Sequence, residues 1–327
     1  MSVLLPQPLG PLTATNSLRA ISSETPSKAC TARAPVLYSR VTFRSEIKGA
    51  LSATDVAGAN RGHDFAIVAE RDDFLVVEKP PFLLVHPTKP SSARTLWGEL
   101  KHLLAFEIAN GGQVSIVNRL DRETSGLVLV AKNAATARRF GLLMQEQRIA
   151  KEYLAIVWGW PEWESRSVHA PLARQGAHGP SVIWLKQTIH PAGAAAQTDF
   201  RVERRFTRGG ADDRFSVIRA IPRTGRTHQI RVHLSSLGHP VVGDKIYGPD
   251  EKLYLEFIET GWTSALASKL LLPRHALHSA MIQIDAGEKW ESPLPPDLAD
   301  FVDRQSRSGG LQTAGTKKKG GLETAPP

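Results

Sequence analysis

Residues 118–127 read NRLDRETSGL, and they combine charged groups suited to chemistry with the start of an apolar run, VLVA. Asp121 lies between Arg119 and Arg122. An ionised carboxylate can act as a nucleophile or a general base, and a nearby cation opposes the desolvation that would protonate it in a cleft. The alternative is a surface turn in which Asp121 stabilises the backbone before Thr124. This segment alone leaves both interpretations open.

Most other catalytic signatures are absent from the sequence. It contains no Walker loop, no GxGxxG after a strand, no HExxH and no CxxC pair, which argues against nucleotide hydrolysis and zinc chemistry. The single cysteine, Cys30, excludes an internal disulfide and a thiolate cluster, and it predicts a reducing, cytoplasmic location. His228 and His233 differ by about 140° around a helix and cannot share a face. We therefore expect no metal site.

Length and composition predict a globular protein with a substantial core. The chain has 327 residues, of which 41% are hydrophobic. Its apolar runs, such as LVLVA at 127–131, are far shorter than the roughly 18 residues that a membrane-spanning helix needs. No membrane partner is therefore expected.

The net charge of +9 is distributed unevenly. Residues 1–62 carry seven Lys/Arg and three Asp/Glu, and residues 304–327 carry five and one, so these ends hold +8 (+4 and +4) and the remainder only +1. Within that remainder, residues 201–231 contain nine arginines and no lysine. Because arginine favours bidentate phosphate contacts, this stretch is either a basic surface for RNA or DNA, or a solvated face with scattered ion pairs.

Composition divides the chain into three parts. Residues 1–62 are rich in Ser, Thr, Ala and Pro, residues 304–327 are rich in Gly, Lys and Pro, and both are expected to be disordered. The first segment is interpreted as an over-long start or a linker, with an organelle-targeting peptide as the alternative. Residues 63–303 are expected to form the folded domain.

The folded part alternates short strands with few helices. Runs that alternate in polarity or are rich in β-branched residues predict strands at 65–70, 74–80, 126–133, 151–159, 197–206 and 214–221. These strands do not follow a regular strand–helix–strand rhythm. The pattern predicts an α+β domain built on a mixed, largely antiparallel sheet with flanking helices.

Two longer helices are predicted from capping residues and apolar faces. Asn133 can cap a helix whose buried face includes Phe140. A second helix is predicted within 227–238, with Ile230 on its apolar face and Gly238 just after its end.

The charged segment belongs to an ordered series of motifs. NRLDRETSGLVLVAK at 118–132 resembles the HRLDxxTSGLLLLAK motif of the RluA-type pseudouridine synthases. Five other landmarks of that family have similar segments in the same order along this chain: VVEKPPFLLVHP at 76–87, KEYLAIVWG at 151–159, AAAQTDFRV at 194–202, GRTHQIRVHLSSLGHPVVGDKIYG at 225–248 and RHALHSA at 274–280. The similarity spans roughly residues 65–300.

This resemblance implies a pseudouridine synthase fold with an active-site cleft in residues 63–303. It implies isomerisation of specific uridines in rRNA or tRNA, with base flipping and without a cofactor. Asp121 matches the family's catalytic aspartate, Arg231 its ion-pair partner, and Tyr153 the aromatic residue that stacks on uracil near C5 for the final proton removal. The resemblance further implies four substrate contacts: Arg119, which fills the gap left by the extruded uridine, Ile230, Arg226 and His228.

Some motif positions depart from the family pattern. Asn118 stands where the family usually has His, and Glu78 with Pro81 and Phe82 replaces its usual Asn and small–Gly pair. Neither departure is at the position of the expected nucleophile, so the expected reaction class is unchanged. The departures bear instead on which substrate the protein recognises. Four other motif residues are expected to serve the architecture: Lys79, Gly126, Gly243 and Asp244.

Two functions of other classes remain as alternatives. An RNA-binding folding helper of the same fold would not need the chemistry, although the presence of Asp121, Tyr153 and Arg231 argues against lost activity. A carboxylate-dependent hydrolase such as a glycosidase would need two working carboxylates, and only Asp121 is evident. The expected partner is an rRNA or tRNA stem-loop, bound by a monomer.

Overall fold

The computed structural model describes residues 63–87, 94–209 and 213–303. The segments predicted to be disordered, 1–62 and 304–327, lie outside these ranges, as does Cys30. Within the described ranges, no helix is both long enough and apolar enough to cross a bilayer.

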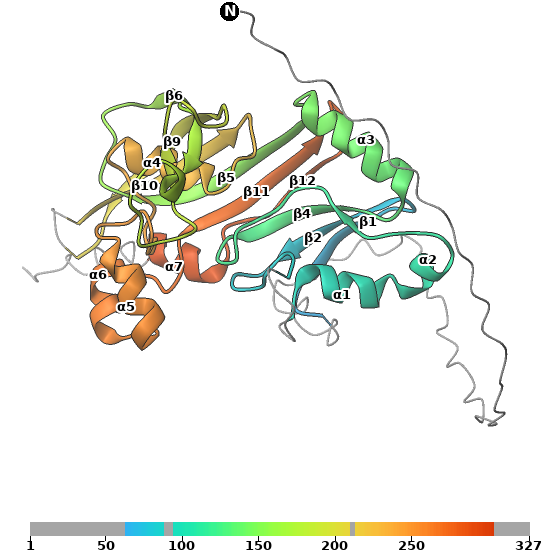
Figure 1. Cartoon of the computed structure of the whole chain (residues 1–327), viewed down its shortest axis with the longest axis horizontal. Coiled ribbons are helices and arrows are strands. Elements are labelled where there is room, and N and C mark those ends of the chain that lie inside the picture. Colours follow the sequence, from blue (N-terminus) through green and yellow to red (C-terminus); the bar gives the residue numbers. More distant parts are fainter. Residues whose placement is uncertain (1–62, 88–93, 210–212, 304–327) are drawn as a thin grey trace, which may run out of the picture. The chain divides into compact units, whose positions relative to one another are not determined.

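A large mixed sheet runs through the described domain (Figure 1). Its strands, in spatial order, are β1 (Ala66–Glu70), β2 (Phe74–Lys79), β4 (Ser125–Ala131), β11 (Leu277–Ile284), β5 (Ile149–Trp158), β10 (Arg214–Pro222), β9 (Gln197–Thr207) and β6 (Ser165–His169). Two short strands extend it: β3 (Ser115–Ile116) pairs with β4, and β12 (Lys289–Glu291) pairs with β11. The β4–β11 pair is parallel and every other pair in this sheet is antiparallel. The predicted α+β class and largely antiparallel sheet are confirmed.

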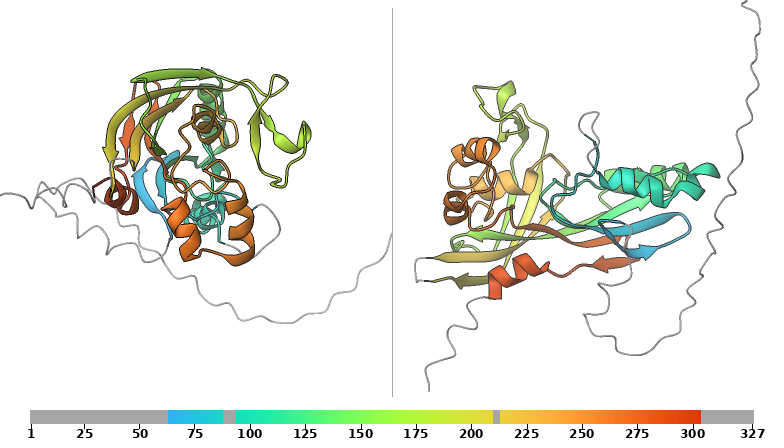
Figure 2. Two further views of the ribbon diagram at one scale, coloured as in Figure 1. Left: turned by 90° about the vertical axis from the view of Figure 1, so that its left-hand side faces the viewer. Right: turned by 90° about the horizontal axis from the view of Figure 1, so that it is seen from below.

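The helices and a separate hairpin complete the domain. The helices are α1 (Leu96–Leu103), α2 (Ala105–Ala109), α3 (Ala134–Gln145), α4 (Gln229–Ser236), α5 (Lys252–Thr260), α6 (Ser264–Leu270) and α7 (Pro296–Asp303). The hairpin consists of β7 (Leu172–Arg174) and β8 (Gln187–Ile189), which pair only with each other as strands and stand out beside the large sheet (Figure 2).

The two predicted helices are α3 and α4. The Asn133 side chain accepts a hydrogen bond from the Thr136 backbone N–H, as expected of an N-cap. Helix α4 begins at Gln229 rather than at 227 because His228 has a left-handed backbone with φ +57°. Gly238, with φ +80°, follows its end as predicted. The expectation of few helices was wrong, since helices of only five to nine residues show little periodicity.

Strands β2 and β4 are buried on both faces because α3 and α1 cover opposite sides of them (Figure 1). Alternate residues along a strand point to opposite faces. One set clusters with Phe140 of α3: Phe74, Val76, Leu127 and Leu129. The other set clusters with Leu96 and Leu100 of α1: Leu75, Val77, Val128 and Val130. Each fully buried side chain of this size contributes about 1.5–3 kcal/mol, which makes this region a rigid base for the loop before β4.

The parallel pair β4–β11 fixes where that loop emerges. Gly126 pairs with Ser279 and has φ +107°, and a Cβ atom at Gly126 would lie 2.3 Å from the Ser279 carbonyl oxygen. Gly243 is similar, with φ +77° and a virtual Cβ 2.0 Å from the Arg274 carbonyl oxygen. Only glycine fits either position, in agreement with the architectural role predicted for both.

Candidate active site

Asp121 lies in the loop between β3 and β4, and the backbone holds this loop without using its carboxylate. The Thr124 N–H donates to the backbone carbonyl of Asp121 at 3.1 Å. Asn118 anchors the loop from the other side, because its side-chain oxygen accepts from the Leu129 N–H at 2.7 Å and its amide donates to the Leu127 carbonyl at 3.2 Å. Asparagine therefore ties down this loop where the family usually has His. The turn is closed by main-chain atoms, so the Asp121 carboxylate is left for the site.

The carboxylate of Asp121 pairs with Arg231 of α4. Arg231 Nη1 donates to Asp121 Oδ2 at 2.9 Å, although the two residues are 110 positions apart. The other edge of the same guanidinium makes a bidentate pair with Asp244, with Nε to Oδ2 at 2.6 Å and Nη2 to Oδ1 at 2.9 Å. Asp244 is fully buried and also accepts backbone N–H bonds from Ile246 and Tyr247. Asp244 thus clamps the arginine in one orientation.

This arrangement keeps Asp121 ionised. Burial alone would raise its pKa, but the positive charge that His228 carries when it is protonated and the charge of Arg231 more than offset burial, and the pKa lies below its ordinary value. Burial lowers the pKa of His228 itself to about 4, with Arg231 adding to the effect, so this imidazole is uncharged at neutral pH. The guanidinium of Arg231 therefore supplies the lasting charge. A carboxylate with 28% of its side chain exposed is thus available as an anion.

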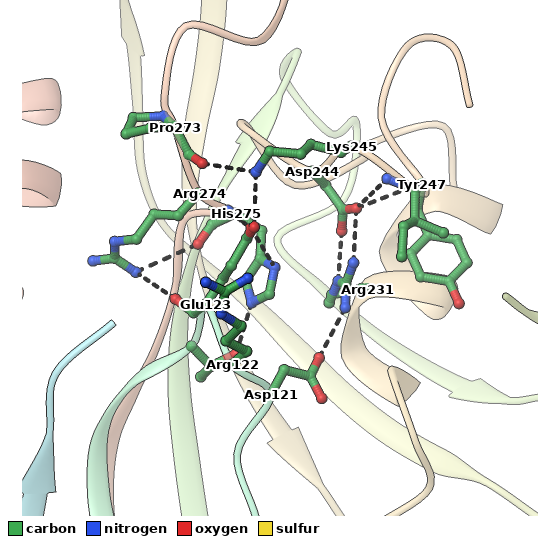
Figure 3. A network of polar contacts seen from close by, with 12 residues as sticks. Asp121, Arg122, Glu123, Arg231, Asp244, Lys245, Tyr247, Pro273, Arg274 and His275 are labelled. Atoms are coloured by element: carbon green, nitrogen blue, oxygen red, sulfur yellow. Dashed lines mark hydrogen bonds and ion pairs between the residues drawn. The ribbon is translucent and has the colours of Figure 1, made fainter. Parts of the chain in front are cut away.

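A second set of polar contacts holds the residues that follow Asp121 in this loop (Figure 3). Glu123 accepts from Lys245 Nζ at 2.8 Å and from the His275 backbone N–H at 3.1 Å. Thr124 Oγ1 lies 2.7 Å from His275 Nε2. Arg274 Nη1 donates to the Glu123 carbonyl at 3.2 Å. Three buried cationic or imidazole side chains thus hold the segment directly after Asp121.

Lys79 connects the loop after β2 to the same segment. It is fully buried, and its ammonium group donates to the carbonyls of Pro80, Leu83 and Arg122 at 2.8, 2.9 and 3.2 Å. Burial lowers the pKa of Lys79 to about 7, with Arg274 contributing. The three carbonyl acceptors agree with its predicted architectural role.

Phe82, which departs from the family motif, has a strained backbone in that loop. It has φ +69°, a conformation that costs a non-glycine residue on the order of 1 kcal/mol, and its carbonyl accepts from Arg122 Nε at 3.3 Å. The other departure, Glu78, accepts a hydrogen bond from Ser292 Oγ at 2.7 Å.

A cleft of about 480 Å³ is lined in part by Asp121. This volume lies within the range of about 300–1,000 Å³ that is typical of small-molecule sites. All seven residues predicted from the sequence line it: Asp121, Tyr153, Arg231, Arg119, Ile230, Arg226 and His228. They come from three regions of the chain, namely the β3–β4 loop, β5, and the loop leading into α4 with that helix.

Tyr153 and Ile230 form apolar parts of the wall. Tyr153 is 8% exposed and lies on β5, and burial, together with the negative charge of Asp121, raises the pKa of its phenol to about 12. It is therefore a neutral phenol at physiological pH. Ile230 is 6% exposed and also belongs to the main core cluster, so it serves both packing and the cleft.

The arginine-rich stretch is mostly ion-paired, which favours the second of its two interpretations. Surface arginines of β9, β10 and the following loop pair with acidic neighbours: Arg201 and Arg219 with Glu203, Arg219 also with Glu152, Arg204 with Asp303, Arg205 with Glu164, and Arg223 with Asp199. In such pairs the carboxylates neutralise arginine charge that could otherwise bind phosphates. Arg226 is exposed, and among the described residues its side chain donates only to the Ala195 carbonyl, while Arg119 is exposed at the cleft.

Several cleft or supporting residues were not singled out from the sequence. His86 and Lys151 line the cleft, and burial lowers the pKa of each, with Arg119 adding to the effect on His86. Tyr247 packs against Arg231, with the guanidinium 5.0 Å from the ring centre. Each lies within a quoted motif, but a motif does not show which of its side chains turn toward the cleft.

The described residues contain no group of three His, Cys, Asp or Glu side chains arranged to hold a metal ion. His233, considered above as a ligand, is fully buried and already bonded at both ring nitrogens, to Thr198 Oγ1 at 2.9 Å and to the Ala170 carbonyl at 3.0 Å. It serves hydrogen bonding in the core.

Comparison with curated proteins gives a consistent assignment. Residues 73–236 match the family model described as RNA pseudouridylate synthase. The chain is 34% identical over 246 residues to the ribosomal large subunit pseudouridine synthase D of Pseudomonas aeruginosa, covering 72% of this chain and 70% of that protein. It is 33% identical over 249 residues to the protein of the same name from Salmonella typhimurium, covering 72% and 69%.

Solved structures resemble the fold. The human RNA pseudouridylate synthase domain containing 1 protein aligns with a TM-score of 0.54 at 27% identity, over 73% of this chain and 86% of that one. The human domain containing 4 protein aligns with a TM-score of 0.57 at 21% identity, over 74% and 93%, and supports the fold alone. From its motifs, its sheet and these similarities, the chain belongs to the RNA pseudouridylate synthase family, of the RluA type, and is an RNA isomerase.

Proposed function

We propose that this protein converts specific uridines of ribosomal RNA to pseudouridine, using Asp121 as its reactive carboxylate and no cofactor. The observation that carries the proposal is the ion pair in the lining of the cleft, in which Arg231 holds Asp121 as an anion. Ribosomal RNA is favoured over tRNA because the curated relatives described above are named ribosomal large subunit synthases.

The reaction needs little beyond positioning and one base or nucleophile. The N1–C1′ bond breaks with its electron pair going to the uracil, the ring turns, and C5 bonds to C1′ while the C5 proton leaves and N1 gains one. An ionised Asp121 can start this by attacking C1′, by adding to C6 of the ring or by removing the C2′ proton. The atoms of the nucleotide are conserved, so no oxidant or reductant is consumed.

The cleft walls suit a flipped uridine. A base inside a stacked helix cannot be reached, so the target must be extruded into the site. We propose that the ring of Tyr153 lies against the uracil and that Ile230 packs on it. Arg119, exposed at the cleft, is proposed to fill the gap in the RNA, and Arg226 to contact phosphate.

The hydrolase alternative is less compatible with the site. A glycosidase needs a pair of carboxylates at a defined separation. Asp121 supplies the only carboxylate among the described residues that line the cleft. A folding-helper role is compatible with the same RNA-binding surface and would persist without the chemistry.

Pseudouridine mapping tests the proposal and identifies the substrate. RNA from cells with and without this chain would be cyanoethylated and sequenced, because pseudouridine reacts at N1 and uridine does not. A ribosomal RNA position that loses its signal without the chain is the expected result. If only a tRNA position lost its signal, the substrate would be tRNA rather than rRNA. If every position kept its signal, the proposal would be contradicted.

Activity is expected to survive exhaustive chelation. The proposed steps use a carboxylate and an arginine, and they require no Lewis acid. The measurement compares turnover of purified enzyme before and after dialysis against EDTA. Loss of turnover that zinc restores would overturn the cofactor-free mechanism.

Trimming the chain to residues 63–303 is expected to weaken RNA binding at low salt without changing the modified position. The removed ends hold +8 of the +9 net charge, and many arginines of 201–231 are ion-paired. Each phosphate contact contributes a slope of about −0.7 in log affinity against log salt on single strands, so the slope should become shallower. Salt titrations of both forms measure it. An unchanged slope would mean that the ends make no phosphate contacts, and a changed position would mean that they select the substrate.

A further inference from the structure

The loop before α4 presents a histidine to Asp121 in a defined way. His228 Nε2 lies 4.0 Å from Asp121 Oδ2, and the His228 side chain is only 10% exposed. No described residue accepts a hydrogen bond from this nitrogen, and the side chain lines the cleft. His228 therefore turns one nitrogen toward Asp121, and no described residue lies within hydrogen-bond distance of that nitrogen.

The other ring nitrogen contacts Tyr247, and this contact determines the tautomer. His228 Nδ1 lies 2.8 Å from Tyr247 Oη. The backbone N–H of Gln187, on β8, donates to the same phenol oxygen at 2.8 Å. Tyr247 is 6% exposed, and burial raises the pKa of its phenol, so the hydroxyl keeps its proton. Among the described residues, His228 Nδ1 is the only acceptor within reach of that proton.

The tautomer follows from counting protons. Because the phenol donates to Nδ1, this nitrogen must be unprotonated, and the single proton of the neutral ring sits on Nε2. Burial lowers the pKa of His228 to about 4, in agreement with a neutral ring. The site therefore contains an uncharged N–H donor directed at the space beside Asp121.

We propose that His228, held as the Nε2–H tautomer by Tyr247, donates a hydrogen bond to a carbonyl oxygen of the target uracil while the base is detached. This proposal rests on the proposed function. Whichever bond Asp121 makes first, the uracil gathers negative charge on its carbonyl oxygens as N1 separates from C1′. A donor placed for that charge stabilises the transition state more than the ground state.

A neutral imidazole suits this role better than a protonated one. A protonated imidazole could transfer its proton to the uracil anion, whose electrons are needed at C5 to form the new bond. The N–H of a neutral imidazole is far less acidic, so it can donate without giving up its proton. Tyr247 is then a positioning residue that acts through His228, and the β7–β8 hairpin positions Tyr247 through Gln187.

Two amide substitutions at His228 distinguish hydrogen-bond donation by Nε2 from a role of His228 in the left-handed backbone conformation. The side-chain nitrogen of Gln can occupy the place of Nε2, whereas that of Asn reaches only the place of Nδ1. We expect His228→Gln to keep turnover within about 10-fold of wild type, and His228→Asn to lose about 100-fold in kcat with KM nearly unchanged. Because Asn tolerates the φ of +57° better than Gln, a purely conformational role predicts the opposite order.

Tyr247→Phe and nitrogen NMR complete the test. In the ¹⁵N-labelled wild-type protein at pH 7, long-range ¹H–¹⁵N spectra are expected to show His228 with its proton on Nε2. Tyr247→Phe is expected to mix the tautomers and to lower kcat about 10-fold. A wild-type Nδ1–H tautomer, or an Asn variant more active than the Gln variant, would overturn the inference. Failure of the wild-type protein to make pseudouridine would instead overturn the proposed function, and the NMR result would still decide the tautomer.

Discussion

Asp121→Asn is expected to lower the rate of pseudouridine formation roughly ten-thousand-fold while leaving RNA affinity within a few-fold. The amide keeps the shape of the side chain, and its oxygen can still accept the bond from Arg231 Nη1. It cannot, however, attack carbon or accept a proton at neutral pH. Single-turnover kinetics on an unmodified large-subunit rRNA transcript, together with a binding titration, separate the two effects.

Asp285→Asn is a matched control for that substitution. Asp285 also pairs with an arginine, Arg148, but it lies outside the cleft and half of its side chain is exposed. Its backbone has φ +55°, which asparagine tolerates. This control should retain turnover within about two-fold, as expected for a surface ion pair. If Asp121→Asn kept even a tenth of wild-type turnover, Asp121 could not be the reactive group.

Arg231→Lys is expected to reduce turnover about 100-fold or more and to destabilise the protein. The guanidinium bonds Asp121 with one nitrogen and Asp244 with the other two, in a single plane. An ammonium group on a flexible stem is a point charge and cannot reproduce this fork. Fully buried Asp244 would lose at least one of its charged contacts, and leaving such a group poorly paired costs about 1–3 kcal/mol. Turnover and thermal unfolding measure the two effects.

Arg219→Lys provides the comparison on the sheet surface. Arg219 also bridges two carboxylates, those of Glu152 and Glu203, and its side chain is 24% exposed. Loss of this bridge should leave turnover near wild type because neither partner lines the cleft. Near-normal activity of Arg231→Lys, or an equal loss in both variants, would remove the proposed ion pair from the mechanism.

Local signals in the sequence were sufficient for most of the longer elements. Asn133 and Phe140 predicted α3 because capping and a 3.6-residue period are both encoded within one segment. The strands β1, β2, β4, β5, β9 and β10 were found from alternating polarity or β-branched residues, which are also local signals, whereas β6 and β11 were not predicted. The β7–β8 hairpin and the short helices were not found, because strands of three residues and helices of five to nine carry too few positions to reveal a period.

The sequence predicted which residues form the candidate site but not how their side chains contact one another. The motifs named Asp121, Tyr153 and Arg231, which the fold brings to one cleft. The clamp of Asp244 on Arg231 and the contact of Tyr247 with His228 depend on how the chain turns after α4, which no local pattern specifies. The pairing of the surface arginines is likewise a matter of strand register, since Arg219 meets Glu152 only because β10 pairs with β5.

Release of tritium from RNA labelled at C5 of uridine tests the central claim most directly. Forming the C5–C1′ bond requires that the C5 hydrogen leave, whereas RNA binding or hydrolysis of the N1–C1′ bond leaves it in place. With an unmodified large-subunit rRNA transcript, the purified wild-type chain is expected to release tritium to water in proportion to the pseudouridine formed, with no free uracil and no change in RNA length, and Asp121→Asn is expected to release none. Free tritiated uracil, or RNA that stays bound and fully labelled, would contradict the account.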